Sequence, residues 1–298
     1  MSLRYTSALD LPTLQMRILI IGLGYTGSSL ACRLLSSGHQ VVGLRRSPSR
    51  DDDPEGIELV QGTVHDDAIL DRLPSELDAI VYAISPEERS DRAYEQAYPL
   101  GVKRVISRYP GTRFLFVGSS SVYAQNDGSV VTEASPALSK TDTAKRLRQA
   151  EDLALASGPQ AVVLRSSGIY GPRRTTMVAR LQAAELDERS RDIWTNRIHR
   201  EDLACALHTL LEAPQAAGVF LATDPTSSTL GQIQDWLRAQ PESTFLVPDK
   251  RLKARARLSR RLESARLQEL GFSFQYPSFR EGYREILDKL PQVSDSVS

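Results

Sequence analysis

Three glycines near the N-terminus have the spacing of a phosphate-binding turn. They follow directly after the apolar run 18–21 and precede the small-residue stretch 28–37, which predicts a helix. Glycine in such a turn allows a tight bend and lets a pyrophosphate approach the main chain, where amides at the helix start can bind it. The pattern predicts a dinucleotide site; the alternative is a glycine-rich turn in another α/β domain. The residues expected to bind the cofactor here are Gly22, Gly24, Tyr25, Thr26 and Gly27.

Two arginines end the next apolar run, residues 41–44. An NAD site usually has Asp or Glu about 20 residues after the glycine turn, where the carboxylate binds the ribose 2′-hydroxyl. Arg45 and Arg46 stand there instead, and a guanidinium can bind the 2′-phosphate of NADP. We therefore expect NADP, with NAD as the second choice. The alternative is that both arginines project into solvent from a loop.

Strand and helix patterns alternate through the first half of the chain. The patterns predict further strands at 57–60, 79–84, 114–117 and 161–164, and helices at 66–73, 93–109 and 143–156. This alternation predicts an α/β fold with a doubly wound, Rossmann-type parallel sheet, in which ligands bind at the carboxyl ends of the strands. Ala83 and Ile84, at the end of the fourth strand, are expected to line the cofactor site.

The second half of the chain is divided by proline and glycine into shorter segments. We expect an N-terminal extension (1–15), an NAD(P)-binding Rossmann domain (16–165) and a smaller C-terminal α/β lobe (166–298), mainly on the substrate side. A segment near 219–222 is expected to return to the sheet. The basic stretch 250–266 alternates with leucines, which predicts an amphipathic helix with a solvated basic face.

The composition gives no support for several classes of partner. Lys and Arg (37) balance Asp and Glu (37), so we expect no nucleic acid and no membrane surface as a partner. Cys32 and Cys205 fit buried thiols better than a disulfide, and the dispersed His39, His65 and His208 do not suggest a metal site. We expect a cytoplasmic monomer or homodimer that acts on a small-molecule substrate.

Ordered motifs from residue 17 onward resemble those of the extended short-chain dehydrogenase/reductases, the group of nucleotide-sugar epimerases and dehydratases. The motifs are FVGSSSVY at 116–123, TE at 132–133, LR at 164–165, IYGP at 169–172, NRIHREDLA at 196–204, LGF at 270–272 and YP at 276–277. The likeness is greatest to the atypical subgroup of NAD(P)-dependent epimerase/dehydratases.

The resemblance implies a catalytic serine, tyrosine and lysine. Ser119 stands at the position of the serine, which hydrogen-bonds the reacting oxygen. Lys145 stands at the position of the lysine, which holds the nicotinamide ribose. The alternative for Lys145 is a surface lysine at a helix start. Thr141 stands where the proton-transferring tyrosine is typical. An aliphatic hydroxyl is far less acidic than a phenol, so Thr141 can bind an oxygen but donates a proton poorly.

His199 is the best replacement acid, because an imidazole titrates near neutral pH. The alternative is a structural histidine that caps a helix or bridges the two lobes. The resemblance also places Val64 on the adenine ring. The side chains expected to bind substrate are Ser120, Arg173, Arg174, Asn196 and Arg197.

These features predict an NAD(P)-dependent oxidoreductase or an epimerase/dehydratase-like protein. It would transfer a hydride at a hydroxyl or carbonyl carbon of a small polar substrate, and sugar-like substrates are included. The missing tyrosine supports a function of another class. In that hypothesis the protein is a non-catalytic NADP(H)-binding sensor or regulatory protein.

Overall fold

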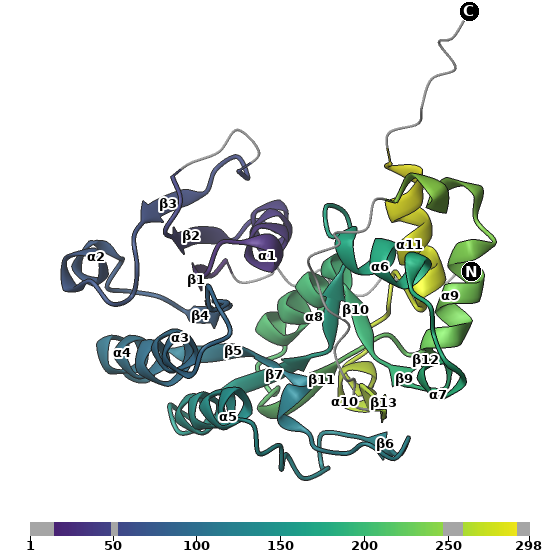
Figure 1. Ribbon diagram of the computed structural model, residues 1–298. Helices are drawn as coiled ribbons and strands as arrows, with labels where there is room; N and C mark the ends of the chain where they lie inside the picture. The colour runs from purple at the N-terminus through teal and green to yellow at the C-terminus, as the bar shows by residue number, and fades with distance from the viewer. Residues whose placement is uncertain (1–14, 49–52, 247–258, 291–298) are drawn as a thin grey trace, which may run out of the picture.

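A parallel sheet forms the centre of the computed structural model, which describes residues 15–48, 53–246 and 259–290 (Figure 1). Its strands are β1 (Arg17–Ile21), β2 (Gln40–Arg45), β3 (Glu58–Gln61), β4 (Ala79–Tyr82), β5 (Arg113–Ser119), β7 (Val162–Ser166) and β11 (Gly218–Ala222). Their order is β11-β7-β5-β4-β1-β2-β3, and every neighbouring pair is parallel. The predicted doubly wound, Rossmann-type sheet is confirmed.

Helices cover both faces of the sheet, because successive side chains of each buried strand point to opposite sides. Ile18 and Ile20 of β1 pack with α1 (Tyr25–Ser36) and α8 (Arg200–Glu212). Leu19 and Ile21 belong to the apolar core on the other face, which includes residues of α4 (Gly101–Arg108) and α5 (Asp142–Leu155). The short helix α2 (Asp67–Arg72) follows β3.

The predicted helix 93–109 is interrupted by a wider turn. The structure has α3 (Asp91–Glu95), the π-helix η1 (Gln96–Leu100) and then α4. Pro99 lies inside η1, and proline cannot donate the regular helical hydrogen bond. The Tyr82 hydroxyl donates to the Ala97 carbonyl at 2.6 Å, and a Cβ at Gly101 would lie 2.0 Å from this hydroxyl. The tyrosine therefore satisfies a carbonyl of the widened turn and occupies space that only glycine leaves open.

The chain after β7 builds most of a C-terminal region with its own apolar cluster. Its strand pairs are β8 (Gly168–Tyr170) with β10 (Arg197–His199), and β9 (Trp194–Thr195) with β12 (Ser228–Thr229). Its helices are α6 (Thr176–Ala183), α7 (Glu188–Arg191), α9 (Leu230–Arg238), η3 (Pro241–Phe245), α10 (Ala265–Glu269) and α11 (Phe279–Asp288). Segment 218–222 leaves this region as β11 and pairs with β7.

The described part of the basic stretch does not form the predicted amphipathic helix. Residues 247–258 lie outside the described ranges, and β13 (Arg261–Leu262) pairs with β6 (Val130–Val131). Arg260 is buried and donates to the carbonyls of Ser120 and Tyr123, at 2.9 and 3.2 Å. These carbonyls flank the short helix η2 (Ser120–Val122). The prediction was wrong here because the arginine satisfies main-chain acceptors instead of facing water.

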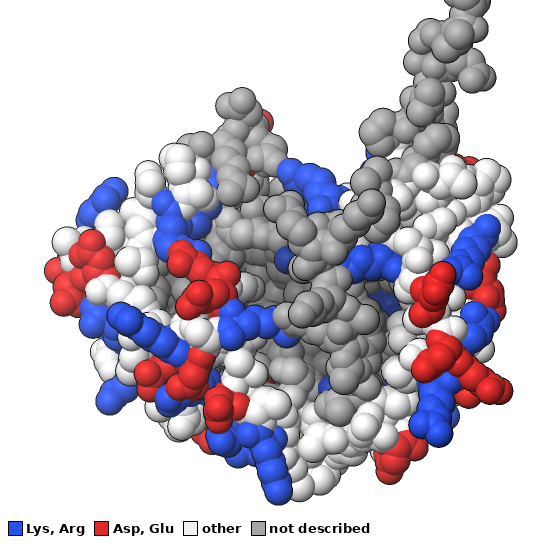
Figure 2. All heavy atoms as spheres, in the orientation of Figure 1, with Lys and Arg blue, Asp and Glu red and all other residues white. Residues whose placement is uncertain are grey.

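Charged side chains of both signs are interspersed over the face shown in Figure 2. This mixture agrees with the balanced composition. Within the described ranges, no helix has both the length and the apolar character needed to cross a membrane.

Candidate active site

The glycine turn lies where the strand order reverses, between β1 and β4. Gly22 has a φ of 100°, and a Cβ there would lie 2.7 Å from the Ala83 carbonyl carbon. A Cβ at Gly27 would lie 2.3 Å from the Gly22 oxygen. Neither position accommodates a side chain. A Cβ at Gly24, in contrast, would meet no described atom within 4 Å.

The open side of Gly24 fits the approach of a diphosphate. Among the described residues no side chain caps the start of α1 at Tyr25, so its first amides can bind an anion. The Ala83 amide donates to the Ile21 carbonyl at 2.7 Å, which holds the end of β4 beside the turn. Ala83 and Ile84 are half-buried there.

Tyr25 links the glycine turn to the loop after β8. Its hydroxyl donates to the Pro172 carbonyl at 2.8 Å. The guanidinium carbons of Arg174 and Arg200 lie 4.1 and 4.8 Å from the centre of its ring, within the range of cation–π interaction. Arg174, which was expected to bind substrate, is exposed and lies against Tyr25 of the glycine turn. Arg173 beside it is exposed, with a φ of 68°.

The two arginines after β2 have different environments. Arg45 is buried and donates to both carboxylate oxygens of Asp53 and to the carbonyls of Ser47 and Pro48. It therefore holds its own loop together. Arg46 is exposed and pairs with the exposed Glu87. Of the two, Arg46 is better placed to bind a phosphate from solvent.

Two residues expected at the cofactor have no accessible side chain. Val64 is 0% exposed within the apolar core, so the predicted contact with adenine is wrong: its side chain has no surface left. Thr26 is also buried, in the first turn of α1. Thr26 can meet a ligand only through its main chain.

The residues in the positions of the catalytic serine, tyrosine and lysine lie on neighbouring elements. The Ser119 hydroxyl, at the end of β5, accepts from the Ser121 amide at 3.2 Å, and Ser120 beside it is nearly buried. Thr141 caps the start of α5, because its hydroxyl accepts from the Ala144 amide at 3.3 Å. Lys145 is exposed and donates to Asp142 at 2.8 Å.

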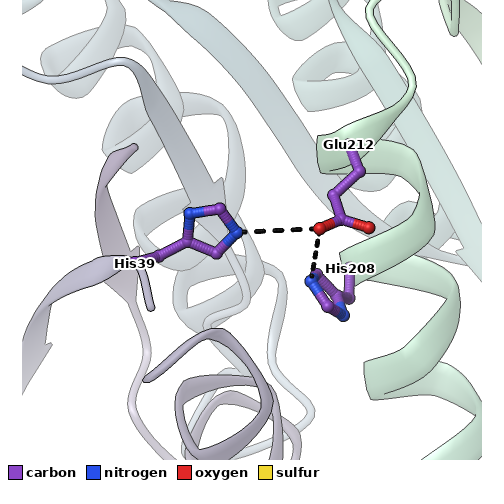
Figure 3. A group of neighbouring side chains, drawn as sticks. All are labelled: His39, His208 and Glu212. Atoms are coloured by element: carbon purple, nitrogen blue, oxygen red, sulfur yellow. Dashed lines mark ion pairs between the residues drawn. The ribbon is translucent and has the colours of Figure 1, made fainter. Parts of the chain in front are cut away.

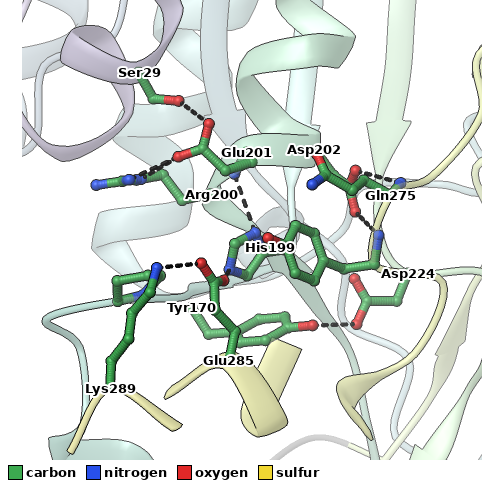
Figure 4. A network of polar contacts seen from close by, with 12 residues as sticks. Ser29, Tyr170, His199, Arg200, Glu201, Asp202, Asp224, Gln275, Glu285 and Lys289 are labelled. Atoms are coloured by element: carbon green, nitrogen blue, oxygen red, sulfur yellow. Dashed lines mark hydrogen bonds and ion pairs between the residues drawn. The ribbon is translucent and has the colours of Figure 1, made fainter. Parts of the chain in front are cut away.

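His199 is part of a buried polar network between α8 and α11 (Figure 4). Its Nδ1 accepts from the Glu201 amide at 3.3 Å, so His199 caps α8. Its Nε2 lies 3.1 Å from Glu285, and its ring lies over Tyr276 with 3.6 Å between centres. Burial lowers the pKa of His199 to about 4, although the Glu285 carboxylate opposes this shift. At neutral pH the imidazole is uncharged and out of contact with solvent.

The prediction of His199 as the replacement acid is therefore wrong, and the structure supports the capping and bridging role. The neighbouring Asp202 has a similar structural role. Its buried carboxylate accepts from the amides of Gln275 and Tyr276 at 2.8 and 2.9 Å. Together these contacts attach the segment before α11 to the start of α8.

Asn196 and Arg197, two expected substrate ligands, hold the C-terminal region together instead. The Asn196 amide donates to the Arg260 carbonyl at 2.9 Å, and its oxygen accepts from the Leu262 amide at 2.8 Å. Arg197 is buried, donates to Thr195 and lies over the rings of α11. These side chains are occupied by internal contacts.

A buried ion pair between α5 and β7 was not predicted from the sequence. Arg165 donates to Glu151 at 2.7 Å and to the Tyr123 hydroxyl at 2.9 Å. Burial raises the pKa of Glu151, against the effect of the guanidinium. Glu151 follows Leu147 and Ala150 on the buried side of α5. A carboxylate among the apolar positions of this predicted helix was the signal in the sequence.

The NAD dependent epimerase/dehydratase family model matches residues 18–221, more than half of the chain. The chain belongs to this family. Protein YeeZ of Escherichia coli K12 is 28% identical over 282 residues, which cover 88% of this chain and 96% of YeeZ. The family assignment confirms the resemblance inferred from the motifs.

Solved structures share the fold over nearly the full length. A Methylobacillus flagellatus protein assigned to the NAD-dependent epimerase/dehydratases is 29% identical, with a TM-score of 0.73 and coverage of 92% of this chain and 98% of that one. MoeE5 in complex with UDP-glucose and NAD is 23% identical, with a TM-score of 0.72 over 91% of this chain and 97% of MoeE5. At this identity the MoeE5 comparison supports the fold alone.

Proposed function

We propose that the protein is an NADP(H)-dependent oxidoreductase or epimerase that acts on a hydroxyl or carbonyl carbon of a small polar substrate, including sugar-like ones. The observation that carries the proposal is the open side of Gly24 beside the uncapped start of α1. Bound there, a nicotinamide cofactor would supply the hydride.

The protein's own groups would have distinct roles. Ser119 is the last residue of β5 and would hydrogen-bond the reacting oxygen. Lys145 would exchange its exposed ion pair with Asp142 for the ribose hydroxyls of the cofactor. Thr141 holds the start of α5 and is a poor acid. The proton would then come from water or from the substrate itself.

The preference for NADP depends on Arg46. An exposed guanidinium at the end of β2 can exchange Glu87 for a 2′-phosphate, and such surface ion pairs are weak. Arg45 would keep the loop in shape through Asp53. Arg174, stacked on Tyr25, would add positive charge near the diphosphate.

Oxidation of NADPH with a panel of aldehydes, ketones and keto-sugars tests the proposal. We expect turnover with at least one of them and its loss in Ser119→Ala. Thr141→Tyr should raise the rate if only the acid is missing, and Thr141→Ser, which keeps the helix cap, is its control. Tight NADPH binding without turnover in any of these proteins would favour the sensor. In that case the Thr141 hydroxyl would serve only as the helix cap of α5.

A further inference from the structure

Two histidines and a glutamate converge at the start of β2, at the end of the sheet opposite the glycine turn (Figure 3). His39 directly precedes β2, whereas His208 and Glu212 are one turn apart on α8. The Nε2 atoms of His208 and His39 lie 3.2 and 3.8 Å from the same oxygen of Glu212. His39 and His208, which lie far apart in the sequence, are therefore neighbours in the fold, with 6.1 Å between their ring centres.

The Nε2 atoms of both histidines are buried. The His39 side chain is 0% exposed and that of His208 is 16% exposed. Within the described residues, neither Nε2 atom has a hydrogen-bond partner of acceptable geometry. Buried polar atoms without a partner are uncommon in folded proteins, and a bound water or ion is one explanation for them.

We propose that His39, His208 and Glu212 bind a divalent transition-metal ion, with Zn²⁺ as the best fit. Two imidazole ligands suit zinc, nickel and copper better than magnesium or calcium, and zinc also accepts a carboxylate beside them. Zinc–nitrogen bonds of about 2.0–2.1 Å in a tetrahedron place neighbouring ligand atoms about 3.3 Å apart. The three ligand atoms here all lie within 4.8 Å of one another, so small rotations of the side chains suffice. A fourth position would remain for water.

One contact limits the affinity of the site. The Met16 amide donates to Nδ1 of His39 at 3.2 Å, so the neutral ring carries its proton on Nε2. A metal ion at Nε2 requires this proton to move to Nδ1, and the Met16 hydrogen bond is then lost. Metal-bound histidines usually donate their second ring N–H to an acceptor, and loss of such a partner typically costs about 10–100-fold in affinity.

A bound ion would join the turn between α1 and β2 to the last turn of α8. These segments are more than 160 residues apart in the sequence, since one contains His39 and the other His208. The site is separate from the glycine turn, which follows the opposite end of β1. We therefore expect the ion to stabilise the fold rather than take part in hydride transfer.

Metal titration of the full chain, prepared without a histidine tag and stripped with a chelator, tests this proposal. We expect calorimetry to give one Zn²⁺ per chain, and Co²⁺ to produce the visible absorption of a low-symmetry site. His208→Gln should weaken binding at least tenfold, and Zn²⁺ should raise the melting temperature of the wild type but not that of His208→Gln. His65→Gln, which removes an exposed histidine, is the matched control.

Two results would overturn the site. One is a wild-type protein that is folded by circular dichroism and binds neither ion. The other is equal binding by the wild type, His208→Gln and Glu212→Gln. Because His208 and Glu212 are partly exposed on α8, both variants should fold, and circular dichroism verifies this.

Discussion

Acidification should destabilise the wild type more than a His199→Asn variant. Burial lowers the pKa of His199 to about 4, whereas an unfolded chain titrates near its ordinary value of about 6.5. Between these values the unfolded state binds more protons than the folded state, so stability rises with pH across this window. The contribution is fully present above about 6.5 and is lost as the pH falls toward 4.

The magnitude follows from the same two pKa values. At about pH 5 the folded imidazole is still neutral and the unfolded one is protonated, a difference of about 1.5 pKa units. At about 1.4 kcal/mol per unit, wild-type stability should fall by about 2 kcal/mol between pH 7.5 and 5 through His199 alone. Asparagine keeps the helix cap of α8, because its side chain can accept from the Glu201 amide.

Urea unfolding at several pH values measures this effect. The free energy of unfolding of the wild type should fall more steeply toward pH 5 than that of His199→Asn, since all other groups titrate in both proteins. His65→Gln removes an exposed histidine and should retain most of the wild-type slope. Parallel profiles for the wild type and His199→Asn would refute the buried, neutral state of this imidazole.

Three further predictions concern the cofactor site and the core. Arg46→Ala should weaken NADPH binding at least about tenfold while NADH binding changes little, because a charge-assisted hydrogen bond contributes about 1.5–3 kcal/mol. Equal losses in calorimetry would contradict the role of Arg46. Arg45→Ala should weaken the binding of both cofactors, because the loop loses the contacts that hold its shape. Gly22→Ala should lower stability by about 1–3 kcal/mol, because its φ of 100° and the adjacent carbonyl leave no room for Cβ; an unchanged melting temperature would show that the turn can relax. Arg165→Met should cost about 3–5 kcal/mol in urea unfolding by leaving the Glu151 carboxylate buried and unpaired; a loss below about 1 kcal/mol would indicate that Glu151 is protonated or hydrated.

The sheet could be predicted because its buried parallel strands are short apolar runs with turn residues between them. The glycine turn could be predicted from the spacing of its glycines between an apolar run and a helix. A Cβ at Gly27 would lie too close to Gly22 within the same turn, whereas a Cβ at Gly22 would lie too close to Ala83 after β4. Pro99 was visible in the predicted helix 93–109. The hydrogen bond that satisfies a carbonyl of its widened turn comes from Tyr82, which lies on a strand outside this helix. Local patterns do not record such contacts.

The roles of the polar side chains were harder to predict. Arg45 and Arg46 are adjacent and chemically identical, and only the tertiary contact with Asp53 distinguishes the buried one from the exposed one. His199 has the right chemistry for an acid, but its burial under Tyr276 removes the charge. Sequence gives the type and spacing of such groups, whereas packing decides their protonation and access.

Calorimetric titration of the folded full chain with NADPH and NADH tests the central claim most directly. We expect saturable binding at one site, tighter for NADPH. Gly24→Val should abolish it with an unchanged melting temperature, because a Cβ at Gly24 would meet no described atom within 4 Å and the added side chain would occupy the space of the diphosphate. A Cβ at Gly158 would also meet no described atom within 4 Å, so the Gly158→Val variant should bind both cofactors like the wild type. No heat with either cofactor, or equal binding by Gly24→Val, would contradict the account.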